Sequence, residues 1–296
     1  MDKKGTRWII ESMQFATIYH ENCIETLRRM DDDLIDMTIT SPPYDDLREY
    51  NGYHFPVEEI AAGLFAKTKP GGVVIWVVGD RTLKGDESLT SFEHAFAFRK
   101  AGFKVHDTMI YAKNNPIPSD CGKRYRQCFE YMFCFSKGSP KTFNPIVQEI
   151  KQEKAFKSFR ITKVGRNDLE HDHVAPKERK VDNVFFYCDC DDENRKFHYG
   201  DTEIFYYNVG TSSSKDKVAF GHPAIFPEKL VEDQVKTWTD PGAVVYDCFM
   251  GSGTTAKIAH QLDRRWIGSE ISGEYIAIAK QRLAPYLDNL ELSASK

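Results

Sequence analysis

Residues 244–260, VVYDCFMGSGTTAKIAH, join a short apolar run, a glycine turn and the start of an amphipathic segment. The apolar run predicts a buried strand that ends at Asp247, and the residues after the turn have helical spacing. Gly251 and Gly253 would let the backbone approach a ligand closely, and the N-terminus of the following helix offers free N–H groups. The stretch therefore predicts a strand–turn–helix unit of an α/β fold, with a ligand at the turn.

A diphosphate is not the favoured ligand of this turn. The G-x-G spacing is followed neither by the third glycine of the dinucleotide fingerprint nor by the lysine of a phosphate-binding loop. Glu270 comes nineteen residues after Gly251, at the end of the next predicted strand, where an acid commonly accepts hydrogen bonds from a ribose diol. A tight turn that only links a strand to a helix would look similar, so the pattern alone leaves both interpretations open.

Apolar runs alternate with helical spacing along most of the chain. The predicted strands are residues 34–40, 72–80, 243–247 and 265–270, and the helical segments that follow them are 57–68, 88–102, 252–263 and 272–287. Such alternation predicts an α/β fold with a doubly wound, mostly parallel sheet and ligand sites at the carboxyl ends of its strands. Residues 103–113 and 129–138 predict two further strands that would close the sheet, with an antiparallel arrangement expected.

The composition fits a globular protein, with 41% hydrophobic and 28% charged residues and a net charge of −4. No apolar run has the ~18–20 residues of a transmembrane helix, and the N-terminal apolar stretch is too short for a signal peptide. We therefore expect a soluble, cytoplasmic protein. The seven scattered cysteines indicate reduced thiols. Cys188 and Cys190, with His171 and His173 upstream, lack the spacing of common structural zinc sites, so no metal is expected.

Residues 139–206 interrupt the alternation, because they are richer in charge and poorer in apolar periodicity, and we interpret them as an inserted lobe. Within them, residues 151–180 carry nine Lys or Arg against five Asp or Glu, and Phe156 and Phe159 lie between the first basic residues. Charge alone favours a solvated surface segment. A polyanionic substrate would favour phosphate contacts instead.

The stretch TITSPPYDDLREYNGY, residues 38–53, directly follows the first predicted strand. Pro42 and Pro43 have no N–H to donate and a fixed φ, so they end the strand and hold the chain stiffly. The Ser41 hydroxyl and the Pro42 carbonyl would then form a pair of hydrogen-bond acceptors, beside the flat ring of Tyr44. This arrangement suits a planar heterocycle with an exocyclic amine. The structural alternative is a proline turn that merely ends the strand.

These segments together resemble the amino-methylating DNA methyltransferases. TSPPYDDLREYNGY resembles their catalytic motif, and DCFMGSGTTAKIAHQLDRRWIGSEIS resembles their S-adenosylmethionine motif. HPAIFPEKLVEDQV, residues 222–235, resembles the segment that completes the methionine site, and residues 18–44 resemble the family's lead-in. The order, with the catalytic motif first and the cofactor motif last, is that of the β class. The resemblance therefore implies a circularly permuted, Rossmann-like fold of the seven-stranded type, with an inserted target-recognition region.

The resemblance implies S-adenosyl-L-methionine as cofactor and divides the chain by role. Residues 1–138 would be the catalytic half, 139–206 the target-recognition region and 207–296 the cofactor-binding half. In the lead-in, Asn22 stands where the family usually has an acid that contacts the cofactor adenine, so the hydrogen bond is possible but the charge is absent. The implied cofactor-binding residues are Asn22, Cys23, His222, Pro223, Phe226, Asp247, Phe249, Gly251, Ser252, Gly253, Thr254, Thr255 and Glu270.

The catalytic motif implies methylation of an exocyclic amine. Methylation of cytosine at carbon 5 requires a cysteine nucleophile, and the chain contains no Pro-Cys pair. Direct transfer would use Ser41, Pro42, Pro43 and Tyr44, and the target base would flip out of the duplex. In this family a serine in the first position goes mostly with cytosine N4, so we predict that base, with adenine N6 as the alternative. Asp80 either orients Ser41 or takes the released proton, or is only a strand-end residue.

A DNA substrate makes the basic segments candidates for phosphate contacts. The candidate DNA-binding residues are Lys123, Arg124, Arg126, Lys157, Arg160, Lys163 and Arg166. We expect double-stranded DNA as the partner of a monomer or homodimer of bacterial, archaeal or phage origin, with no membrane partner. A cognate restriction endonuclease would be a functional partner that need not bind the enzyme. The rival functions are an RNA or protein amide methyltransferase and a nucleic-acid-binding protein with a decayed cofactor site.

Overall fold

The structure, a computed structural model, describes residues 13–43, 55–113, 123–125, 127–149 and 226–286, together with short strands between residues 156 and 204. The chain divides into two compact units, Met1–Asn144 with Asn183–Lys296 and Pro145–Asp182. The smaller unit lies within the predicted insert. The division of the chain by role remains a prediction.

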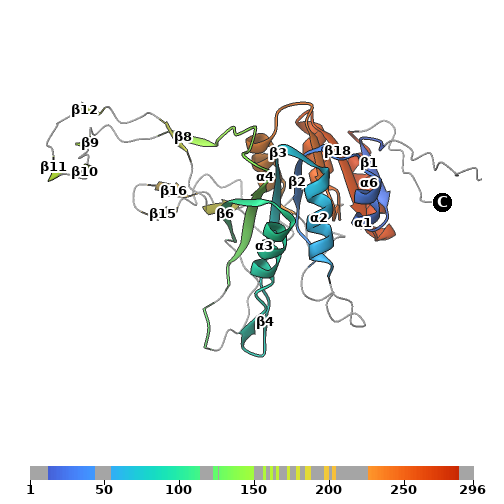
Figure 1. Ribbon diagram of the computed structural model, residues 1–296, viewed down its shortest axis with the longest axis horizontal. Helices are drawn as coiled ribbons and strands as arrows, with labels where there is room; N and C mark the ends of the chain where they lie inside the picture. The colour runs from blue at the N-terminus through green and yellow to red at the C-terminus, as the bar shows by residue number, and fades with distance from the viewer. Residues whose placement is uncertain are drawn as a thin grey trace, which may run out of the picture. The chain divides into compact units, whose positions relative to one another are not determined.

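The larger unit is built on an eight-stranded sheet of order β1-β18-β17-β2-β3-β7-β6-β14 (Figure 1). Neighbouring strands from β1 to β3 are parallel, β7 is antiparallel to both β3 and β6, and β14 is parallel to β6. The strands are β1 (Thr17–His20), β2 (Ile35–Thr40), β3 (Thr68–Val78), β6 (Lys104–Lys113), β7 (Phe129–Ser136), β14 (Val184–Tyr187), β17 (Val244–Asp247) and β18 (Arg265–Glu270). The predicted mostly parallel sheet with antiparallel closing strands is confirmed.

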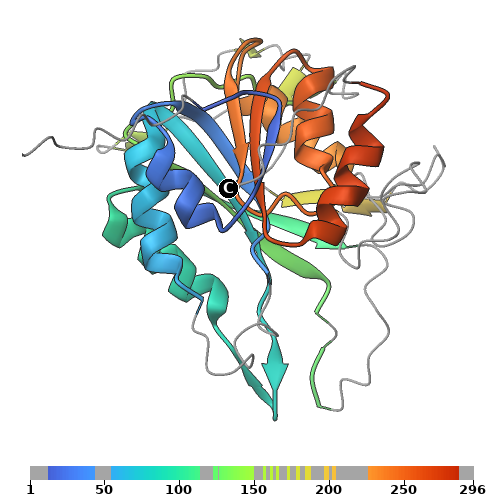
Figure 2. The same cartoon turned by 90° about the vertical axis from the view of Figure 1, so that its right-hand side faces the viewer.

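Helices cover both faces of this sheet (Figure 2). They are α1 (Cys23–Arg29), α2 (Val57–Lys67), α3 (Thr90–Ala101), α4 (Glu228–Trp238), α5 (Thr254–Gln261) and α6 (Gly273–Leu283). One core cluster contains Leu27 of α1, Ile60 of α2 and Phe98 of α3, and the other contains Leu230 of α4 and Ile276 of α6. The two clusters use alternate residues of β3, because successive side chains of a strand point to opposite faces. The sheet is therefore doubly wound, as predicted.

The structure adds elements that the sequence patterns did not reveal. These are β1, α1, α4 and β14 in the larger unit, with a small hairpin of β4 (Thr82–Leu83) and β5 (Asp86–Glu87) and a further pair, β15 (Phe197–Tyr199) and β16 (Thr202–Ile204). Among the described residues, no helix is both long enough and apolar enough to cross a membrane.

The smaller unit consists of nested antiparallel strand pairs. β8 (Val147–Glu149) pairs with β13 (Glu178–Lys180), β9 (Phe156–Lys157) with β12 (Asp172–His173), and β10 (Ile161–Thr162) with β11 (Gly165–Arg166). The innermost pair is β10 with β11 and the outermost is β8 with β13. We call Pro145–Asp182 the hairpin unit, and the basic segment 151–180 lies within it.

Candidate active site

The predicted functional side chains lie at the ends of parallel strands that share one edge of the sheet. Ser41 follows β2, Asp80 follows β3, Asp247 ends β17 and Glu270 ends β18. The strands are parallel, so their carboxyl ends meet at the same edge, which is where open α/β sheets bind ligands. The fold therefore brings the end of the Ser41 strand and the glycine turn to one edge, although more than two hundred residues separate them.

The glycine turn between β17 and α5 has a conformation that only glycine adopts readily. Gly251 has φ 52° and Gly253 has φ 80°, both in the left-handed region. A Cβ on Gly253 would also lie 3.0 Å from the Cβ of Ala279 in α6. The turn is thus fixed both by backbone conformation and by close packing of α6 behind it.

Glu270 holds the glycine turn through its carboxylate. Its Oε2 accepts a 2.8 Å hydrogen bond from the Gly251 N–H, and its Oε1 accepts one of 2.8 Å from the Ser272 N–H. The residue is 9% exposed. Each carboxylate oxygen retains a second lone pair, so Glu270 has acceptor capacity left for the hydroxyls of a bound ligand.

Asp247 joins the glycine turn to the strand that precedes Ser41. Its Oδ1 accepts a 2.6 Å hydrogen bond from the Thr40 hydroxyl and one of 3.0 Å from the Phe249 N–H. Burial raises the pKa of this carboxyl from 3.8 to about 6, although the hydroxyls of Thr255 and Thr40 and the Phe249 N–H act to lower it. Thr40 immediately precedes Ser41, so this buried bond fixes the end of the Ser41 strand beside the turn.

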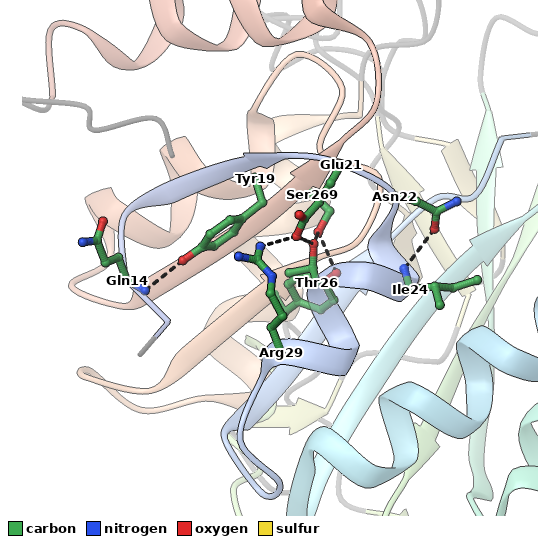
Figure 3. Close-up of polar contacts among 9 residues, drawn as sticks. Gln14, Tyr19, Glu21, Asn22, Ile24, Thr26, Arg29 and Ser269 are labelled. Atoms are coloured by element: carbon green, nitrogen blue, oxygen red, sulfur yellow. Dashed lines mark hydrogen bonds and ion pairs between the residues drawn. The ribbon is translucent and has the colours of Figure 1, made fainter. Parts of the chain in front are cut away.

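At the other side of β18, the β1–α1 turn carries Asn22. The Asn22 Oδ1 accepts a 2.9 Å hydrogen bond from the Ile24 N–H and thereby caps α1 (Figure 3). Asn22 is exposed, whereas the neighbouring Cys23 is buried. Because His20 of β1 pairs with Glu270 in the sheet, Asn22 lies two residues beyond that register position. The predicted adenine-binding residue, Asn22, therefore follows β1, and the predicted ribose-binding residue, Glu270, ends the adjacent strand β18.

A network of hydrogen-bonded hydroxyls connects this turn to the neighbouring strands (Figure 3). Tyr246 shares a 2.8 Å hydrogen bond with Ser269, Ser269 donates to Thr26 at 2.8 Å, and Thr26 donates to Glu21 at 2.7 Å. Arg29 forms an ion pair with the same Glu21 carboxylate. The network links β17, β18 and α1, so the Asn22 turn is anchored to the strands that carry Asp247 and Glu270.

The predicted catalytic side of the edge, around Ser41, contains prolines and aromatic rings. Ser41 and Pro43 are partly buried and Pro42 is buried. Phe249, from the loop before the glycine turn, lies 6.1 Å from the Trp76 ring of β3 and 5.8 Å from the Phe55 ring, measured between centroids. The aromatic contacts therefore pack the loop that carries Phe249 against β3, the strand that leads to Asp80.

Asp80 caps the start of α3. Its Oδ1 accepts a 2.8 Å hydrogen bond from the Ser91 N–H, and its Oδ2 accepts one of 2.5 Å from the Ser91 hydroxyl. A carboxylate at the N-terminus of a helix stabilises it, so Asp80 anchors the start of α3. The two catalytic roles that the sequence predicted for Asp80 stay predictions.

Comparison with known proteins identifies the family. The model of the N6/N4 methyltransferase family, described as DNA methylase, matches residues 35–281. This chain belongs to the DNA methylase family. The orphan methyltransferase M.BamHII of Bacillus amyloliquefaciens is 46% identical over 253 residues, which are 86% of this methylase and 90% of the relative. The type II methyltransferase M.BglII of Bacillus subtilis is 25% identical over 279 residues, 90% of this chain and 68% of the relative.

Solved structures share the fold of this methylase. A structure titled PvuII DNA methyltransferase (cytosine-N4-specific) has a TM-score of 0.64 at 23% identity and covers 93% of this chain and 90% of that chain. The M1.HpyAVI–SAM complex has a TM-score of 0.55 at 23% identity and covers 90% of this chain and 99% of that chain. The predicted family and Rossmann-like fold are confirmed.

Of the methylase's remaining predicted residues, the structure describes some and not others. Phe226 packs against the core, Thr254 and Thr255 are buried at the start of α5, and Lys123 is exposed. Arg124 forms a 3.2 Å ion pair with Glu87 and donates to the Gly85 carbonyl, so it contacts the β4–β5 hairpin. Predicted residues that lie outside the described residues are Tyr44, Arg126, Arg160, Lys163, His222 and Pro223, and the side chains of Lys157 and Arg166 are also not described.

Two residues of the methylase site were missed by the sequence patterns. Thr40 looked like an ordinary strand residue, and Arg282 looked like a polar residue of an amphipathic helix. Both are buried, and both contact the residues around the glycine turn. For Arg282 a signal existed, because it adjoins Leu283 and follows Ala279 by three positions, close to the apolar face of α6.

Proposed function

We propose that this DNA methylase transfers a methyl group from S-adenosyl-L-methionine to the exocyclic N4 of cytosine in duplex DNA. The observation that carries the proposal is the Thr40–Asp247 hydrogen bond, which holds the strand end before Ser41 beside the glycine turn. A methyl donor at the turn and an amine at Ser41 would then be neighbours, and proximity of this kind lowers the barrier to direct transfer.

The chain's own residues fit this cofactor. Glu270 would accept hydrogen bonds from the ribose hydroxyls, and Asn22 would bind the adenine from the adjacent strand. The glycine turn would allow the backbone to approach the methionine portion. Phe249, just before the turn, and Phe226, just before α4, would complete this part of the site. The cofactor supplies an electrophilic methyl group on a sulfonium.

The Ser41 hydroxyl and the Pro42 carbonyl would accept the two amine protons of the target base. These hydrogen bonds draw the nitrogen toward tetrahedral geometry and free its lone pair from ring conjugation. The freed lone pair would form the new N–C bond to the donated methyl group, the sulfur would keep the electron pair of the broken S–C bond, and the surplus amine proton would leave to solvent water. The base must leave the duplex to reach this position, at a cost of a few kcal/mol of unstacking that Tyr44 would offset by stacking.

The choice of cytosine rests on Ser41, the first residue of the motif. Expression in a methylation-free host, followed by genomic sequencing that distinguishes N4-methylcytosine from N6-methyladenine, tests this choice. We expect N4-methylcytosine at one short recognition sequence. N6-methyladenine would identify the alternative base, and unmodified DNA together with methylated RNA or peptide would contradict a DNA substrate.

The catalytic roles are tested by Ser41→Ala and Tyr44→Ala. Removing one acceptor of a transition-state hydrogen bond typically costs about 10²- to 10³-fold in rate, so we expect Ser41→Ala to lower the transfer of tritiated methyl groups to DNA by that order. Affinity for S-adenosylmethionine should be retained. Wild-type rates in both variants would overturn the proposed mechanism.

We further propose that the hairpin unit contacts DNA. It contains the basic segment 151–180, and a two-stranded ribbon fits the major groove of B-DNA. Lys157 and Arg166 belong to its strands β9 and β11. Binding through phosphates should weaken steeply with salt, and a flat salt response would remove this role.

A further inference from the structure

Arg282 of α6 is a fully buried cation with several acceptors. Its side chain is 0% exposed. Nη1 donates to the Ser252 carbonyl at 2.9 Å, to the Ser252 hydroxyl at 3.0 Å and to the Thr254 hydroxyl at 2.9 Å, while Nη2 donates to Glu228 at 2.7 Å. One guanidinium thus contacts the glycine turn, the first residue of α5 and the first residue of α4.

The charges around Arg282 form a small cluster from three helices. Glu228 Oε1 also accepts a 2.8 Å hydrogen bond from Lys257 of α5, whose side chain is 9% exposed. A buried cation needs an anionic partner and further hydrogen bonds to offset the loss of water, and Arg282 has both. Its planar fork allows several acceptors at once, which a lysine cannot match.

One peptide unit of the turn is held at both ends, by Arg282 at its carbonyl and by Met250 at its N–H. The Ser252 carbonyl accepts from Arg282, and the N–H of the same peptide, on Gly253, donates to the Met250 carbonyl at 2.9 Å. Glu270 holds the turn on its other side through Gly251. The protein's own groups therefore hold the peptide planes of the turn, and a preorganised backbone binds a ligand at a lower ordering cost.

A second arginine provides a comparison within the same helix pair. Arg264 donates to the Thr239 carbonyl at 2.6 Å, to the Thr239 hydroxyl at 3.0 Å and to the Leu262 carbonyl at 2.5 Å. Thr239 and Leu262 are the C-terminal caps of α4 and α5. Arg264 and Arg282 thus join the same two helices at opposite ends, and of the two it is Arg282 that contacts the glycine turn.

We propose that Arg282 is a positioning residue for the methyl donor: it holds the glycine turn and the start of α4 in the geometry that binds S-adenosylmethionine. The proposal rests on the proposed cofactor site at the turn. Arg282 acts through Ser252, Thr254 and Glu228 and does not touch the reacting atoms. Its loss therefore weakens cofactor binding and spares the chemical step at saturating cofactor.

The test compares three variants of the full-length chain with the wild type. Arg282→Met removes the hydrogen bonds at similar volume, Arg282→Lys keeps the charge without the fork, and Arg264→Met removes the clamp at the far ends of α4 and α5. Calorimetry gives the Kd of S-adenosylmethionine, thermal unfolding gives Tm, and steady-state methylation gives kcat and both KM values.

We expect Arg282→Met to raise the Kd and KM of S-adenosylmethionine about tenfold or more, with kcat at saturating cofactor and the KM of DNA within about threefold of wild type. The cofactor Kd of Arg282→Lys should lie between those of the wild type and Arg282→Met. Arg264→Met should lower Tm by about as much as Arg282→Met does. It should leave the cofactor Kd within about twofold of wild type, because the partners of Arg264 lie away from the turn.

Equal cofactor affinity in Arg282→Met and Arg264→Met would overturn the proposal and leave Arg282 a purely structural role. If Arg282→Met does not fold, Glu228→Gln decides, because it weakens the cluster from α4 without touching the turn. That variant must raise the cofactor Kd, and an unchanged Kd would also overturn the proposal. Absence of cofactor binding by the wild type would contradict the proposed cofactor site instead.

Discussion

The proposed cofactor side and the proposed catalytic side of the sheet edge are built in different ways. On the cofactor side, residues far apart in the chain hold the glycine turn: Glu270 and Arg282 donate or accept at its backbone, and Asp247 binds Thr40 across 207 residues. On the catalytic side, Pro42 and Pro43 stiffen the chain locally, and Asp80 is tied to Ser91 only eleven residues away. The first side is thus ordered mainly by contacts between residues distant in the sequence, whereas the second also relies on proline stiffness and on a contact between residues close in the sequence.

This difference predicts how each side fails. Substitutions on the cofactor side should change cofactor affinity and the stability of the whole sheet together. Substitutions that loosen a local cap on the catalytic side should have small effects, because the prolines remain. The following variants test the contrast in order of expected effect.

Glu270→Ala should have the largest effect. It removes the acceptor of two backbone N–H groups and of the proposed ribose contacts, and hydrogen bonds to a charged group contribute about 1.5–3 kcal/mol each. We expect S-adenosylmethionine to bind about 100- to 1000-fold more weakly by calorimetry. Glu274→Ala, at an exposed position in the first turn of α6, is the control and should bind normally. Normal binding by Glu270→Ala would show that the cofactor lies elsewhere.

Asp247→Asn should change how stability depends on pH. The carboxyl has a pKa of about 6 in the folded chain against 3.8 as the ordinary value, so the folded chain keeps a proton that the unfolded chain has already lost between these values. Its contribution is therefore fully present below about pH 4 and is lost as pH rises through 6. Denaturant unfolding from pH 3 to 8 should show a loss in the wild type about 3 kcal/mol larger than in the variant, at 1.36 kcal/mol per pKa unit. Parallel profiles would contradict a protonated, buried Asp247.

Ser91→Ala should have the smallest effect. It removes the 2.5 Å hydrogen bond to the Asp80 carboxylate but leaves the bond from the Ser91 N–H, and it should lower the free energy of unfolding by about 1.5 kcal/mol. The kcat of methylation should stay within about twofold of wild type. Asp80→Asn should behave similarly if Asp80 only anchors α3. A loss of kcat far beyond that of Ser91→Ala would instead assign Asp80 a part in the chemistry.

The sequence predicted the part of this site that follows from strand ends. The central strands are continuous apolar runs, so the positions of Ser41, Asp80, Asp247 and Glu270 at one edge could be deduced from parallel pairing. β1 has four residues and α1 has seven, which are too short to show a period. These elements form because partners elsewhere in the chain complete them.

The supporting contacts could not be predicted, because a pattern does not show which distant residue a side chain meets. Thr40 and Arg282 are examples, since their roles depend on Asp247 and on the glycine turn. The preference for cytosine differs again, because it rests on Ser41 and on the family resemblance. The fold was therefore more predictable than the contacts that organise the site.

The order of strands also has a consequence for synthesis of the protein. β17 lies between β18 and β2, and β1 pairs with β18. The early strands β1 and β2 therefore cannot complete their pairing until the late strands β17 and β18 have been made. Until residues 244–270 leave the ribosome, β2 has an unpaired edge, and Met37 and Ile39 lack the neighbours that bury them. An open apolar edge invites pairing with other chains. The nascent chain is thus most prone to aggregation until residues 244–270 have been made, and cleavage ahead of Val244 would make that state permanent.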